Sequence, residues 1–67
     1  MIDRREAAAE FAARHGVSEA CASAGLLISA ALRRAAAEHP EMTDGDALLA
    51  LAIVERGVRA AGVPRLR

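Results

Sequence analysis

Apolar and polar residues recur along this chain with the period of an α-helix, in three segments separated by helix-breaking residues. The segments span residues 3–15, 18–38 and 43–61. Each begins at a residue type favoured at helix N-caps, namely Asp3, Ser18 and Thr43. Each ends at a glycine or ahead of a proline, namely Gly16, Pro40 and Gly62. No stretch alternates with the period of a strand, so the pattern predicts one all-α domain with a short basic tail at 62–67.

The three predicted helices differ in the width of their apolar faces. The first has a single large apolar side chain, Phe11. The apolar face of the third covers more than half of its circumference, so we expect neighbours on two sides of that helix. The second carries a narrower apolar stripe: Ala20, Cys21, Ala24, Gly25, Ile28, Ala31, Leu32 and Ala35.

Small residues at helical spacing on the second segment predict close helix packing. Ala20, Ala24, Ala31 and Ala35 lie along one ridge, where two backbones can approach at the lower end of the usual interaxial range of about 8–10 Å. The connection at 39–42 is short, which favours antiparallel neighbours. We therefore expect a short first helix and an antiparallel hairpin of the second and third helices, packed closely through alanine.

Composition adds that this domain is poor in large core residues. Half of its 36 apolar residues are alanine, and Phe11 is the only aromatic residue. A methyl group buries little area, and a domain of this size is marginally stable unless something reinforces it. Cys21 is the only cysteine, which excludes a disulfide within the chain and fits a reducing cytoplasm. We therefore expect the additional stability to come from oligomerisation or from binding to a protein partner.

Two leucines fall on the polar sides of their helices. Leu26 and Leu48 project there, and two helices of one chain could hardly cover them together with the wide face of the third segment. Isolated exposed leucines are also common and need no functional reason. The alternative is an interface, and its predicted residues are Leu26, Leu27, Leu48, Leu49, Ile53, Val54 and Arg56.

Charge excludes several partner classes. Nine arginines balance nine acids and there is no lysine, so the chain lacks the basic footprint of a nucleic-acid binder. Residues 1–6 contain acids and lead into no apolar stretch of a secretory signal. The longest run without charge, 20–32, is too short to span a bilayer. We expect a soluble cytoplasmic protein without a membrane partner, and the arginine and alanine bias is typical of a GC-rich bacterial or phage genome.

Residues 11–20 resemble the first helix and turn of the helix-turn-helix DNA-binding motif, and a regulator of this kind would use residues 11–25. Alanine stands four residues before the turn glycine Gly16, and Val17 and Ser18 open the next helix. The resemblance implies a small DNA-binding regulator whose contact residues would be Arg14, Ser18, Glu19 and Ser23. None of the three on the second helix is an Arg, Lys, Asn or Gln that reads guanine or adenine. Gly25 also stands where the motif usually has a bulky residue, so an ordinary helix cap is the favoured interpretation.

The residues that carry chemistry do not form a recognisable site. His15, Cys21, His39 and Met42 lack zinc-site spacing, and both histidines fall at predicted helix C-termini. Cys21 falls on the apolar stripe, where a buried, inert thiol is expected. No paired carboxylates, phosphate loop or catalytic triad is present, so we expect no enzyme, metal, cofactor or small-molecule substrate.

The sequence thus predicts a non-catalytic protein–protein interaction module: a small adaptor, a regulator or inhibitor of a larger protein, or an assembly component. We expect it to associate with itself, most simply as a dimer through the second and third helices, with a larger protein as a further partner. The alternative is the small DNA-binding regulator.

Overall fold

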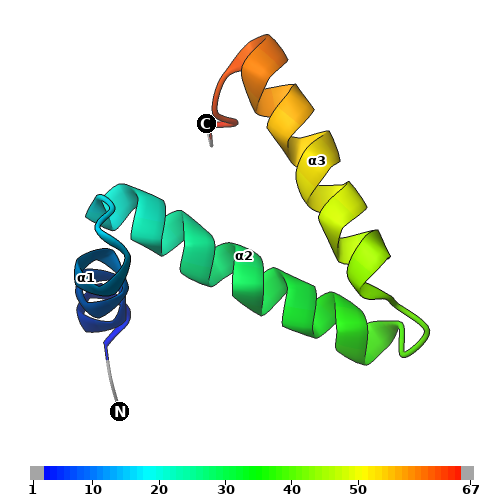
Figure 1. Cartoon of the computed structure of the whole chain (residues 1–67), viewed down its shortest axis with the longest axis horizontal. Helices are drawn as coiled ribbons and strands as arrows, with labels where there is room; N and C mark the ends of the chain where they lie inside the picture. The colour runs from blue at the N-terminus through cyan, green and yellow to red at the C-terminus, as the bar shows by residue number, and fades with distance from the viewer. Residues whose placement is uncertain (1–2, 66–67) are drawn as a thin grey trace.

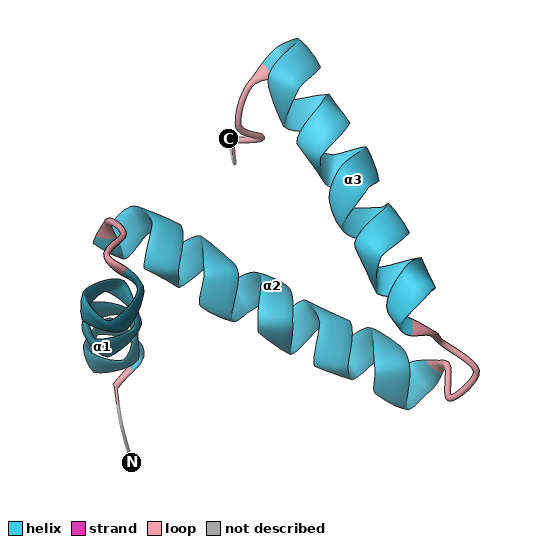
Figure 2. Cartoon of the chain, in the orientation of Figure 1, coloured by secondary structure: helices cyan, strands magenta, loops and turns pink. Residues whose placement is uncertain are grey.

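The computed structural model describes residues 3–65 and contains three helices in that range, with no strand (Figure 2). They are α1 (Arg4–His15), α2 (Glu19–Glu38) and α3 (Asp44–Ala61). The prediction of an all-α, three-helix domain is confirmed. The last two residues of the predicted basic tail, Leu66 and Arg67, lie outside the described residues.

Side chains cap all three helices at their N-termini. The Asp3 carboxylate and the Ser18 hydroxyl accept hydrogen bonds from the backbone N–H groups of Arg5 and Cys21, at 3.4 and 3.0 Å. Thr43 forms a reciprocal capping box with Asp46: the Thr43 hydroxyl accepts from the Asp46 N–H, and the Asp46 carboxylate accepts from the Thr43 N–H. The caps explain why each helix starts one residue after its capping residue.

α1 and α2 pack together at a corner where the chain reverses through Gly16. This glycine has φ 66°, a left-handed conformation that residues with a side chain rarely adopt. The buried residues of the described chain all lie in this corner, and they are the alanines Ala8, Ala12 and Ala22. Phe11 and Leu26 are half-buried against them. The hydrophobic core is therefore a single small cluster between α1 and the start of α2.

α2 and α3 diverge from their connection and form an open V (Figure 1). The close antiparallel hairpin that the short connection predicts is not observed. The connection has non-helical backbone angles, with ψ 81° at His39 and ψ 167° at Thr43. Because α3 is turned away from α2, none of the 18 residues of α3 is buried.

The open V gives the chain dimensions beyond those of a compact monomer. Its Cα radius of gyration is 13.6 Å, whereas a compact domain of 67 residues is expected to have about 11 Å. Its accessible surface is 5907 Å², compared with about 4,000 Å² expected for a folded monomer of 7.0 kDa. The chain thus exposes about 1,900 Å² more than a self-contained protein of its size.

Candidate interaction surface

α3 presents large apolar side chains to solvent around more than one side of the helix. Leu48 is 66% exposed and Ile53 is 55% exposed, although both are large aliphatic residues. The same applies to further aliphatic residues of this helix: Leu49, Leu51, Val54 and Val58. Soluble monomers rarely leave a contiguous apolar patch of this extent uncovered, so α3 is the main candidate for an interaction surface.

An apolar groove lies between the arms of the V. It has a volume of about 300 Å³ and is lined only by apolar residues: Ile28, Ala31, Leu32, Ala35, Ala50, Leu51 and Val54. The first four belong to α2 and the last three to α3. Side chains of another protein segment could fill this groove, whereas a polar ligand would find no hydrogen-bond partner on these side chains.

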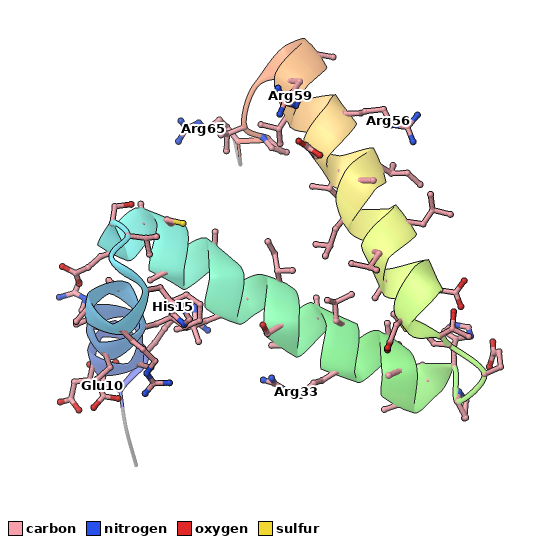
Figure 3. The ribbon with its side chains drawn as sticks, viewed as in Figure 1. Glu10, His15, Arg33, Arg56, Arg59 and Arg65 are labelled. Atoms are coloured by element: carbon pink, nitrogen blue, oxygen red, sulfur yellow. The ribbon has the colours of Figure 1, made fainter. Side chains whose placement is uncertain are left out.

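The predicted interface residues separate into two groups in the structure. Leu27, Leu48, Leu49, Ile53, Val54 and Arg56 are exposed. Figure 3 shows the Arg56 side chain directed away from the interior of the V. Leu26 is different, because it is half-buried against the alanine core of the α1–α2 corner. The side of α2 that carries Leu26 looked polar in the sequence, which is wrong because α1 packs on it. The role of Leu26 in an interface stays a prediction.

Two further predictions for α2 need correction. Cys21 is exposed rather than buried in an apolar stripe. The ridge expected to pack closely is also open, because Ala20, Ala24 and Ala31 are exposed and only Ala35 is half-buried. α1 packs on another side of α2, where Ala22 is fully buried, and α3 does not cover the alanine ridge because the V is open.

The residues that the helix-turn-helix interpretation selects lie around the α1–α2 turn. Arg14 is in the last turn of α1, and Glu19 is the first residue of α2. Both are exposed, as is Ser18, whereas Ser23 is half-buried. The Ser18 hydroxyl is engaged in the N-cap of α2, and Glu19 is the acidic residue in the first turn of this helix. Gly25 leaves space for the Phe11 ring, which explains why a bulky residue is absent at this position.

The ion pairs among residues 3–65 are local and lie on the surface. Glu55 and Arg59 make an ion pair at 2.8 Å on α3, and Arg34 and Glu38 make a longer one at 3.9 Å on α2. His39 lies 3.3 Å from Glu41 in the connection between the two helices. These side chains are largely exposed, and such pairs contribute little to stability. They leave the groove and most of α3 without charge.

Within residues 3–65 the structure contains no cluster of three or more His, Cys, Asp or Glu side chains able to hold a metal ion. Buried polar or charged side chains are also absent from this part of the chain. The His15 ring, at the C-terminal end of α1, lies with its centroid 4.3 Å from that of the Phe11 ring, and the two rings are tilted by 40°. This position gives it a structural contact with the α1–α2 corner.

α2 is long and apolar enough, by length and composition alone, to cross a membrane. Its charge-free part, residues 20–32, spans only about 20 Å along the helix axis, compared with about 30 Å of bilayer hydrocarbon. Arg33 and Arg34 follow directly, and Figure 3 shows Arg33 on the side of α2 that faces away from α3.

The sequence prediction missed part of this surface. The sequence analysis placed Ile28 and Leu32 on the apolar stripe of the second helix, but it assigned neither of them nor Leu51 to an interface. Their joint role depends on the angle between α2 and α3, and no sequence pattern specifies that angle.

No protein-family model, curated protein sequence or solved structure matches this chain.

Proposed function

We propose that this protein is a non-catalytic protein–protein interaction module that associates with a second copy of itself through α2 and α3. The observation that carries this proposal is the accessible surface, which exceeds that of a compact monomer by about 1,900 Å². Covering this excess on two chains corresponds to about 3,800 Å², within the range of obligate homodimer interfaces. The groove and the exposed aliphatic residues of α3 supply the apolar surface that such an interface requires.

Charge also supports self-association. The chain has no net charge, so two copies do not repel one another at long range. The apolar lining of the groove favours an apolar occupant, and a second α3 offers such side chains over more than half of its circumference. A dimer would cover both surfaces without requiring any other molecule.

A substitution on α3 tests the proposal directly. Ile53→Asp places a charge on the exposed apolar face, and burying that charge at an interface is unfavourable. We expect self-association to weaken about 100-fold, which corresponds to about 3 kcal/mol. Sedimentation equilibrium over a concentration series measures this change.

Ala9→Asp is the matched control, because Ala9 is an exposed alanine of α1 and lies outside the proposed interface of α2 and α3. We expect this variant to associate like the wild type. Equal association of both variants with the wild type would contradict the use of this face. If the wild type is a monomer and binds lipid vesicles or duplex DNA, the proposed self-association is wrong, and the result supports a membrane-binding or DNA-binding function.

A further inference from the structure

We infer that α3 of one copy crosses α3 of a second copy at Gly57. This inference rests on the proposed self-association and adds the place of closest contact. Gly57 lies in the interior of α3, where glycine costs about 1 kcal/mol of helix stability relative to alanine. A close approach of another backbone to the helix is a physical reason for a glycine at such a position.

The two glycines in helix interiors have different surroundings. At Gly25, a Cβ atom would already touch the Phe11 ring, at 3.4 Å from Cζ, so packing of α1 on α2 accounts for the absence of a larger side chain. At Gly57, a Cβ atom would meet nothing within 4 Å. The chain's own fold therefore does not account for the missing side chain at Gly57, whereas a partner helix would.

Gly57 belongs to a continuous row along one side of α3. The row consists of residues four apart, all exposed: Leu49, Ile53, Gly57 and Ala61. Such i, i+4 rows are the ridges that interdigitate when two helices cross at about −50°. The small residues Gly57 and Ala61 let the backbones approach, while the larger Leu49 and Ile53 pack beside the crossing point.

A second copy is the occupant that the surface favours. The row has no charged member, and the surface that each chain leaves uncovered matches the area an obligate dimer buries. In a two-fold arrangement the same row serves on both chains, because an isologous interface uses the same surface patch of each subunit. One row of one helix is therefore sufficient to build the contact.

A glycine-to-alanine substitution on a helix has opposite effects at a solvent-exposed position and at a position that contacts a partner helix. At an exposed helix position the change stabilises the helix, whereas at a close crossing the added methyl group separates the backbones. We expect Gly57→Ala to weaken the dimer at least tenfold and Gly57→Leu to weaken it further. The dissociation constants are measured by sedimentation equilibrium, and circular dichroism checks that each variant remains helical.

Gly45→Ala is the control on the same helix. A Cβ atom at Gly45 would lie at an ordinary contact distance of 3.5 Å from the Thr43 hydroxyl oxygen, so this variant should associate as strongly as the wild type. If the wild type dimerises and Gly57→Ala behaves like Gly45→Ala, the crossing is wrong while the proposed self-association stands. If the wild type remains a folded monomer, both the crossing and the proposed function are wrong.

Discussion

The two helix pairs of this molecule differ in how far the chain covers its own apolar surface. At the α1–α2 corner, Phe11 and Leu26 close over buried alanines. Between α2 and α3, larger side chains such as Ile28 and Leu51 line an open groove, and α3 contributes no buried residue. The pair with fewer large residues is closed, whereas the pair with more is open.

This difference shows that closure depends on helix geometry as well as on the amount of apolar surface. Alanine and glycine let α1 approach α2 closely, and one aromatic ring then fills the space beside Gly25. α3 diverges from α2 after the 39–42 connection, so its aliphatic residues stay exposed. The corner stabilises the monomer, and the V provides surface for association.

Removing the aromatic ring should have the largest effect on the closed corner. Phe11→Ala leaves Ala8, Ala12 and Gly25 without the side chain that packs over them. Because Phe11 is half-buried, we expect the free energy of unfolding to fall by about 2 kcal/mol, below the range for a fully buried phenylalanine. Urea denaturation followed by circular dichroism at a fixed protein concentration measures this loss.

Leu27→Ala sharpens that comparison. Leu27 is 51% exposed and does not belong to the core. Its neighbour in the sequence, Leu26, packs against the core. We expect this variant to change the free energy of unfolding of the monomer by less than about 0.5 kcal/mol, as surface substitutions usually do, when both variants are compared at protein concentrations below the dissociation constant of the dimer. An equal loss for Phe11→Ala and Leu27→Ala would contradict a core confined to the α1–α2 corner.

Removing an N-cap should have a smaller effect that differs between the two regions. Thr43→Ala removes the capping box of α3 and should cost about 1 kcal/mol. Because no buried residue holds α3 in the monomer, we expect its first turn to unwind and the helical signal at low protein concentration to decrease.

Ser18→Ala provides the comparison, since it removes the corresponding cap of α2. Ala22, one turn later, is fully buried against α1, so the start of α2 has tertiary support. We expect this variant to lower the denaturation midpoint while its helical signal stays close to that of the wild type. The opposite pattern for the two variants would show that α3 is the better supported helix.

The local parts of the fold could be predicted from the sequence. Ser18 and Thr43 specify helix starts, because their hydroxyl groups accept hydrogen bonds from backbone N–H groups three residues away. Gly16 ends α1, because it adopts the left-handed backbone conformation. These signals act within one helical turn, so their outcome does not depend on the rest of the molecule. The caps and the helical periodicity were therefore sufficient to predict the number and the limits of the helices.

The faces of α2 could not be predicted in the same way. This helix uses one side, with Ala22 and Leu26, against α1, and another side, with Ile28 and Leu32, in the groove. A helical wheel drawn over all 20 residues of α2 gives one average apolar stripe. It cannot separate the side that packs against α1 from the side that lines the groove, because these sides belong to different turns of the helix. That averaging placed Leu26 on a polar side and Cys21 in the core.

The solution mass of the wild-type protein tests the central claim, that this chain exposes more apolar surface than it covers by itself. Sedimentation equilibrium at micromolar concentration gives this mass independently of shape, whereas the radius of gyration of an open monomer resembles that of a compact dimer. We predict a mass of twice 7.0 kDa. A stable, fully helical monomer of 7.0 kDa with a radius of gyration near 11 Å would contradict the claim, because its helices would then cover the surface within one chain.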